Sequence, residues 1–217
     1  MTPANQVKDL IVLSADRKIE YALIGILSRP QAIGIRPISL EDPHTHPEHD
    51  PGCFLDGPDF LRFAVHRARY ALIVMDYEGS GQEGRKIRTE MEEDLEYRLH
   101  CGGWENRAAA IVIEPEVESW VWSDSPHVDA VTGWSARHPS LRKWLLQKGW
   151  MQSGEAKPNH PKEALKAALR ISGKPDSAAL YKKLAERVSI DRCTDLSFLK
   201  LKTVLRQWFG STTAPQC

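Results

Sequence analysis

The sequence predicts an α/β protein in which helices cover a mostly parallel sheet. Short apolar runs alternate with helix-like segments between residues 7 and 124, and this alternation is typical of parallel strands joined by helices. The clearest strand is 71–75, an apolar and β-branched run that stops at Asp76 and Glu78. A length of 217 residues suits one domain with a smaller addition. We expect an α/β core over 1–124 and a helical C-terminal extension over 125–217, packed on that core.

The first half of the chain supplies the elements of this core. Residues 7–13 contain four consecutive apolar residues suited to a buried strand, and apolar residues then recur at helical spacing as far as Pro30. Pro37 would place a second strand near a sheet edge. From these patterns we expect strands at 7–13, 33–38 and 71–75, a helix at 59–70, and a loop at 41–57.

The second half is predicted to be mainly helical. A charged helix is expected at 85–100, ended by Gly102 and Gly103, and the apolar run 108–113 is another strand. The polar, proline-containing segment 152–162 is typical of a loop or lid. Further helices are expected to begin at Ser119 and to span 163–171, 177–188 and 198–209, the last with an Asp195 cap.

Composition indicates an ordinary soluble protein. The net charge is zero, with 41% hydrophobic and 27% charged residues, so the whole chain has no strong attraction for nucleic acid or membrane. No apolar run of about 18 residues occurs, and the N-terminus lacks the pattern of a secretion signal. Four cysteines without paired spacing are typical of reduced thiols. We therefore expect a cytoplasmic location and no membrane partner.

Acidic residues follow three of the predicted strands. Asp16 and Glu20 follow the first, Asp76 and Glu78 follow the central strand, and a glutamate-rich segment at 114–118 follows the next. The carboxyl ends of parallel strands share one edge, so these acids are expected to converge there. Carboxylates that converge repel one another unless a cation or protons offset them, and Mg²⁺ or Mn²⁺ prefers such oxygen ligands. The alternative is that the acids cap helices and meet arginines at the surface.

Three segments with these acids resemble a known family. The layout is similar to the Toprim domain of topoisomerases, primases and OLD-type nucleases, and closer to a Toprim-like bacterial family of unassigned function. Small proteins of this kind occur in anti-phage islands, including methylation-associated defence systems. The three segments are Asp16-Arg17-Lys18-Ile19-Glu20, Asp76-Tyr77-Glu78 and, most specifically, Ile113-Glu114-Pro115-Glu116-Val117-Glu118-Ser119-Trp120.

The resemblance implies a role for each group of residues. In a site of this kind Asp16 or Glu20 would handle a proton in catalysis or bind a second metal ion. Positive charge just past the glycine-rich link at 79–84 could steer phosphates, although a solvated helix face explains it equally well. The expected metal ligands are Asp76, Glu78, Glu116 and Glu118, and the expected nucleic-acid contacts are Arg17, Arg85, Lys86 and Arg88.

Two departures from the Toprim pattern keep two functions open. Asp16-Arg17 stands where the family has Glu-Gly, and Asp76-Tyr77-Glu78 stands where it has Asp-x-Asp. One function is a magnesium-dependent nuclease that cuts DNA or RNA phosphodiesters within a prokaryotic defence system. The other is a catalytically degenerate scaffold or regulatory subunit that binds a partner protein or nucleic acid. Other defence-system proteins are the expected partners in either case.

Two further clusters have alternative interpretations. The imidazoles of His44, His46 and His49 could bind zinc, but the prolines around them are typical of a mobile loop. Seven tryptophans could stack on bases in a single-strand groove, although a helical core or an interface is the more usual place for them. Five of the seven lie close together, at positions 120, 122, 134, 144 and 150.

Overall fold

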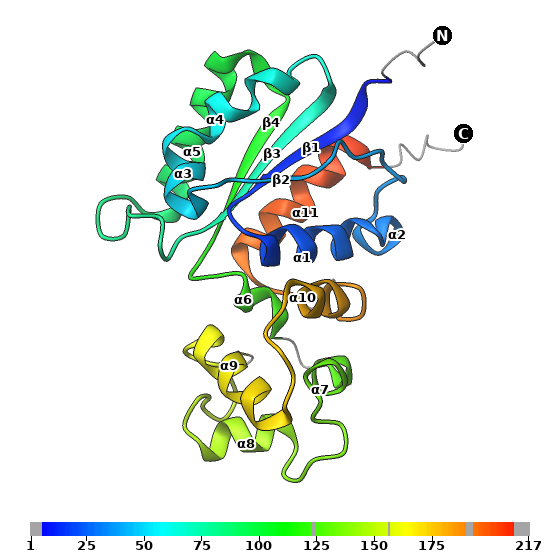
Figure 1. Cartoon of the computed structure of the whole chain (residues 1–217), viewed down its shortest axis with the longest axis vertical. Coiled ribbons are helices and arrows are strands. Elements are labelled where there is room, and N and C mark those ends of the chain that lie inside the picture. Colours follow the sequence, from blue (N-terminus) through cyan, green and yellow to red (C-terminus); the bar gives the residue numbers. More distant parts are fainter. Residues whose placement is uncertain (1–5, 123–124, 156, 190–192, 211–217) are drawn as a thin grey trace, which may run out of the picture.

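The central element is a four-stranded, all-parallel sheet with strand order β2-β1-β3-β4. The computed structural model describes residues 6–122, 125–155, 157–189 and 193–210. The predicted α/β class with a parallel sheet is therefore confirmed, and Figure 1 shows the sheet between helical layers. The strands are β1 (Lys8–Ser14), β2 (His44–Thr45), β3 (Ala68–Asp76) and β4 (Ala108–Ile113).

Helices cover both faces of the sheet, because the chain moves one way from β1 to β2 and the opposite way from β2 to β3 and β4, and right-handed crossovers then place the connecting helices on opposite faces. On one face lie α3 (His49–Leu55), α4 (Gly57–Phe60) and α5 (Arg88–Leu99), and on the other lie α1 (Arg17–Leu27), α2 (Pro30–Ile33) and α11 (Leu196–Phe209) (Figure 1). Because both faces are covered, the strands are almost continuously apolar and buried. The short turns Leu61–Ala64 and His100–Trp104 complete the α3–α5 layer.

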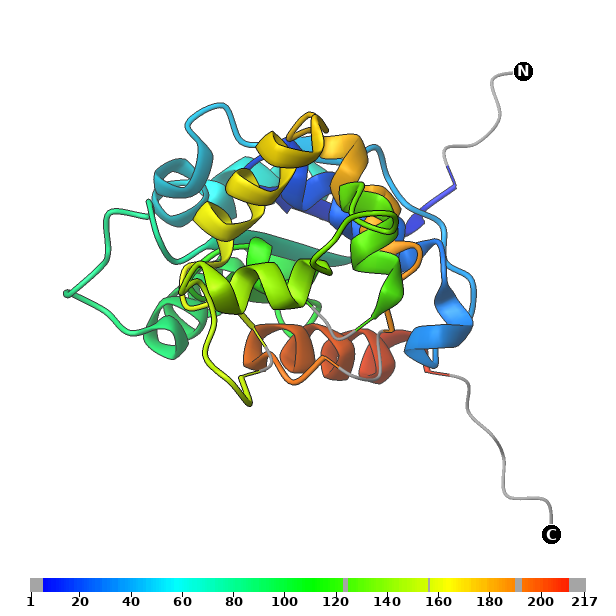
Figure 2. The same cartoon turned by 90° about the horizontal axis from the view of Figure 1, so that it is seen from below.

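The helices after residue 124 divide into two groups. Helices α7 (Pro126–Thr132), α8 (Leu141–Gln147) and α9 (Pro161–Ser172) form a lobe beyond the sheet, joined to it by α6 (Glu118–Val121) (Figure 1). Figure 2, seen from below, shows α8 and α9 in front of the α/β layers. In contrast, α10 (Ala178–Ala185) and α11 return to the α/β core. The expected C-terminal extension is thus partly a lobe and partly a layer of the core.

Helix α10 packs unusually close to α1. A side chain at Gly25 would lie 2.7 Å from the Ala185 Cβ and 2.7 Å from the Lys182 carbonyl oxygen. Only glycine permits this separation of the two helix backbones. The contact fixes α10, and with it the chain leaving the lobe, on the outer side of α1.

Three predicted elements differ from the structure, and the first is the loop expected at 41–57, which contains β2 and α3. The segment expected as a strand at 33–38 instead holds the end of α2 and its C-cap Gly34 in the left-handed conformation (φ 84°), followed by residues without regular secondary structure, and the edge strand is β2. The helix expected at 59–70 is shorter, because β3 begins at Ala68 and pairs with β1 from there. For β2 and β3, pairing with β1 decides the conformation, and the local pattern of side chains does not reveal that pairing.

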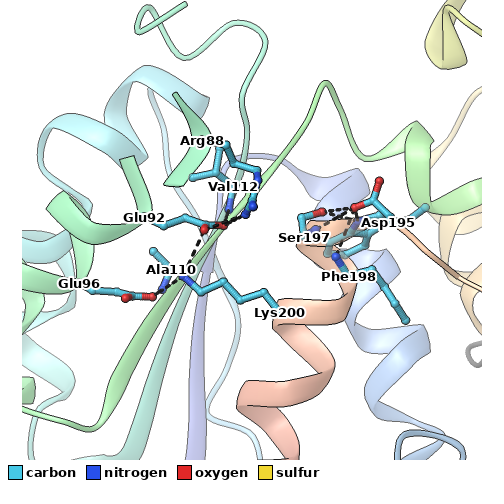
Figure 3. Close-up of polar contacts among 10 residues, drawn as sticks. Arg88, Glu92, Glu96, Ala110, Val112, Asp195, Ser197, Phe198 and Lys200 are labelled. Atoms are coloured by element: carbon cyan, nitrogen blue, oxygen red, sulfur yellow. Dashed lines mark hydrogen bonds and ion pairs between the residues drawn. The ribbon is translucent and has the colours of Figure 1, made fainter. Parts of the chain in front are cut away.

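The outer edge of β4 is closed by carboxylates from α5. The Val112 N–H donates to Glu92 Oε1 at 3.0 Å, and the Ala110 N–H donates to Glu96 Oε1 at 3.0 Å (Figure 3). Lys200 of α11 lies 3.3 Å from Glu92 and 2.7 Å from Glu96, and Arg88 donates to both oxygens of Glu92 at 2.8 Å. These contacts tie α5 and α11, which lie on opposite faces of the sheet, together across its β4 edge.

Glu92 is only 2% exposed, and its replacement by alanine should destabilise the fold. Glu92→Ala would leave the Val112 N–H and the Arg88 guanidinium without their acceptor and Lys200 with Glu96 alone, so we expect a loss of about 2–4 kcal/mol in the free energy of unfolding. Urea denaturation measures this loss. The control is Glu93→Ala, at the exposed neighbouring position, which should stay within about 0.5 kcal/mol of the wild type. Equal stability of the two variants would contradict the role assigned to Glu92.

Within the described residues, no helix is both long enough and apolar enough to cross a membrane.

Candidate acidic site at the carboxyl edge of the sheet

Asp76 is the last residue of β3 and is held inside the protein. Its carboxylate accepts the Val117 N–H at 2.9 Å, and its own backbone N–H donates to Asp50 Oδ1 at 2.7 Å. Only 9% of the residue is exposed. Burial raises the pKa of Asp76 well above its usual value, and nearby carboxylates raise it further.

Those four carboxylates come from three other segments. Asp50 and Glu118 have the larger effects on the pKa of Asp76, followed by Asp16 and Glu116. The expectation that Asp16, Asp76 and Glu116 meet at one edge of the sheet agrees with this arrangement. Burial also raises the pKa of Asp50, although the Asp76 N–H opposes this change. The site therefore gathers acidic side chains in surroundings that favour their protonated form.

Two lysines and a tyrosine offset part of this charge. Lys162, at the start of α9, forms an ion pair with Glu116, which is 4% exposed. The hydroxyl of Tyr181 donates to Glu118 at 2.5 Å, and Lys18 lies 3.6 Å from the same carboxylate and 2.8 Å from Asp176. Burial still raises the pKa of Glu116 despite Lys162. The lobe, α1 and α10 thus contribute the cations and donors that the sheet edge lacks.

The two predicted catalytic acids make local hydrogen bonds. Asp16 is the N-cap of α1 and accepts the backbone N–H groups of Lys18 and Ile19, both at 2.8 Å. Glu20, one turn later, accepts the Thr45 hydroxyl at 2.8 Å. Asp16 is therefore both a helix cap and a member of the acidic cluster, whereas Glu20 is bound to β2.

Glu78 occupies a different environment from Asp76. Because β3 ends at Asp76, Glu78 lies in the following turn, where its side chain is exposed. The i, i+2 spacing suggests that the two side chains project side by side from one strand, but in the structure they do not. Glu78 instead borders a cavity of about 400 Å³ beside Glu116, between the sheet edge and the start of α9.

Two of the four predicted phosphate contacts are engaged in ion pairs. Arg88 binds Glu92, and Lys86 lies 2.6 Å from Asp94. Arg17 and Arg85 are exposed, and Arg17 donates to the Tyr21 hydroxyl at 3.3 Å. The exposed pair could still meet a phosphate, whereas the other two would first have to leave their carboxylates.

The histidine-rich segment has packed into the protein. His44 makes edge contacts with the Phe60 and Phe63 rings at 6.0 and 5.3 Å. His46 is 2% exposed and accepts the Glu48 N–H at 3.1 Å, and His49 Nδ1 lies 3.1 Å from a backbone carbonyl oxygen. Throughout the described ranges, no group of three or more His, Cys, Asp or Glu side chains is arranged to hold a metal ion.

Most of the clustered tryptophans belong to the core. Trp120, Trp122, Trp134 and Trp144 are all buried, and Trp150 packs against them while partly exposed. The indole N–H of Trp122 donates to one backbone carbonyl oxygen of α9, and the indole N–H of Trp134 donates to another carbonyl oxygen of the same helix. The interpretation of these residues as core is confirmed for the four buried rings.

Asp50, Lys162 and Tyr181 are site residues that sequence reasoning did not select. Asp50 stands in the histidine-rich segment, where its neighbours suggested zinc. Lys162 and Tyr181 lie 46 and 63 residues from their carboxylate partners, and no motif connects them. A surplus of acids after three strands was the one signal that compensating groups must exist.

No family model, curated protein or solved structure matches this chain.

The raised pKa of Asp76 predicts that Asp76→Asn will stabilise the metal-free protein at neutral pH. A raised folded-state pKa favours folding at low pH, and this contribution is lost as pH rises through the folded-state value. Asparagine retains the acceptor for Val117 without the charge. With EDTA present, we expect the variant to be about 1–2 kcal/mol more stable at pH 7.5 and equal to the wild type near pH 4.

Chemical denaturation at the two pH values measures this difference. Asp42→Asn, at an exposed position, is the control and should change little at either pH. A variant that is less stable than the wild type at pH 7.5 would show that the Asp76 carboxylate is ionised and stabilising.

Proposed function

We propose that the acidic edge is a Toprim-like site that binds a divalent cation and acts on nucleic-acid phosphodiesters. The observation that supports this most is the burial of Asp76 among four other carboxylates, each of which raises its pKa. A cation would remove the repulsion that the two lysines offset only in part.

The donor chemistry fits Mg²⁺ or Mn²⁺. Magnesium is usually held by one or two carboxylates and completes its shell with water and phosphate oxygens, so it does not require a cage of three protein ligands. Asp76 and Glu116 would hold it, with Glu78 and Glu118 at the margin of the site. When bound, the ion would polarise a phosphoryl oxygen and stabilise charge during transfer.

The surroundings of the site suit an extended, phosphate-bearing substrate. The cavity beside Glu116 adjoins a second one of about 480 Å³, and both are bordered by Glu114 and Asn159. The second cavity is also lined by Arg88 and Lys157, which are paired with Glu92 and Asp195 and would have to exchange these partners for a phosphate. A nucleic-acid strand lying between the lobe and the sheet edge would pass from the carboxylates toward these cations.

A prokaryotic anti-phage defence system in the cytoplasm is the setting we propose. It rests on the resemblance of Asp16–Glu20, Asp76–Glu78 and the Glu-x-Glu-x-Trp segment to the Toprim-like family. Defence-system proteins would then be the partners.

If the edge binds a cation, Mg²⁺ or Mn²⁺ should raise the melting temperature of the wild type. A ligand at about 100 times its Kd stabilises the folded state by about 2.7 kcal/mol, and Asp76→Ala should abolish this gain. Differential scanning calorimetry measures both proteins with and without the ion. Cleavage of single-stranded and duplex DNA and RNA with Mn²⁺ should be lost in the same variant. An equal thermal response in wild type and variant would place the ion elsewhere.

A second function, a non-catalytic scaffold, is favoured by one specific observation. Lys162 and Lys18 already stand beside Glu116 and Glu118, and Asp16 is engaged as a helix cap. Internal ammonium groups would then replace the metal permanently. The acidic edge would serve to attach the lobe, and the chain would bind a partner protein or nucleic acid.

Lys162→Met separates these two functions. Removing the ammonium leaves the buried Glu116 without its partner, so we expect a loss of about 1–3 kcal/mol in the absence of metal. In a cation site, Mg²⁺ should then stabilise the variant more than it stabilises the wild type, because its competitor is gone. In a scaffold, the loss should persist with metal. The control is Lys166→Met, one turn further along α9 and exposed, and calorimetry again provides the measurement.

A further inference from the structure

A separate polar cavity lies at the opposite end of the sheet, where the strands begin. Its volume is about 360 Å³, within the range of small-ligand sites. β3 is nine residues long, so this cavity is roughly 25–30 Å from Asp76. The polar and aromatic residues that line it are Arg36, His66, Arg69, Arg107, Tyr70 and Trp208.

The cavity carries a local excess of positive charge. Three arginines line it, and none of the described residues that line it is acidic. Asp9 neutralises only Arg36, through hydrogen bonds of 2.6 and 3.2 Å. This excess contrasts with the zero net charge of the chain and with the acidic opposite edge.

The other two arginines are differently placed. Arg107 donates to the carbonyl oxygens of Arg69 at 3.1 Å and Gly103 at 3.2 Å, which orients its guanidinium without neutralising it. Arg69 is exposed and has no ion pair within the described part of the chain. One oriented and one unpaired guanidinium therefore border the same cavity.

An aromatic platform adjoins these charges. Tyr70 and Trp208 stack with ring centroids 4.6 Å apart and an interplanar angle of 17°. Trp208 is only partly buried although it belongs to α11, whose other large rings Phe198 and Phe209 are buried. A planar base could extend this stack, and base–aromatic stacking tolerates any base sequence.

We propose that this cavity binds a single-stranded nucleic acid, with a phosphate at Arg69 and Arg107 and a base on Trp208. Guanidinium groups match phosphate geometry, and combined with an aromatic ring they are typical of single-strand recognition. An isolated anion would not require the ring. The site is independent of the acidic edge, so it stands even if the divalent-cation site does not.

The test is fluorescence anisotropy with a labelled oligothymidylate of about 12 nucleotides, titrated with the full chain at several salt concentrations. Arg69→Ala should weaken binding about 5–10-fold at low salt and reduce the slope of log K against log salt by about 0.7, the value for one phosphate contact on a single strand. The control is Arg170→Ala, an exposed arginine of α9, which should leave affinity and slope unchanged.

A second pair of variants tests the ring. Trp208→Leu should weaken binding about 5-fold or more while keeping the salt slope, because stacking carries no charge. Trp208→Phe should retain most of the affinity. Melting temperatures of all variants identify any that fail to fold. Because the Arg69 side chain is exposed in the wild type, Arg69→Ala is expected to fold normally.

Competition distinguishes a strand from its components. Thymidine monophosphate and inorganic phosphate should displace the oligonucleotide only at concentrations at least 10-fold higher. Equal affinity for thymidine monophosphate and for the oligonucleotide would show that the cavity does not recognise a strand. Unchanged oligonucleotide binding in both Arg69→Ala and Trp208→Leu, or no binding by the wild type at low salt, would overturn the site itself.

Discussion

The arrangement of the molecule depends on the burial of negative charge at one edge of a parallel sheet. Buried carboxylates are costly unless paired or protonated, and Asp76 is surrounded by others of the same sign. The compensating groups come from outside the sheet: Lys162 from the lobe and Tyr181 from α10. The same interactions that satisfy the acids therefore hold the C-terminal half against the core. This explains why the lobe begins directly beside the site.

The sequence predicted the part of the fold that depends on local pattern. The strand at 108–113 and the cap at Asp195 are where apolar runs and capping chemistry indicated. The segment 33–38 was misassigned because β2, a two-residue strand, owes its position to pairing with β1 and has almost no pattern of its own. The convergence of Asp16, Asp76 and Glu116 followed from parallel topology, whereas Lys162 could not be found because its role arises only from tertiary packing.

Charge is unevenly distributed along the strands although the chain as a whole is neutral. Carboxylates gather where the strands end, and arginines gather where they begin. Each strand thus connects two regions of opposite potential, and the apolar core between them keeps the two from neutralising each other. A polyanion would be attracted to one end and repelled from the other unless cations were present, so orientation on a nucleic acid would follow from electrostatics alone.

The closed edge of β4 has a consequence for assembly. Exposed strand edges invite pairing with strands of other chains. Here the outward amides of Ala110 and Val112 are occupied by side chains of α5, and the opposite edge offers only the two residues of β2. At the β4 edge the sheet is therefore closed to strands of other chains. A partner that approaches this edge meets side chains of α5 and no free strand backbone, which leaves the four-stranded unit intact.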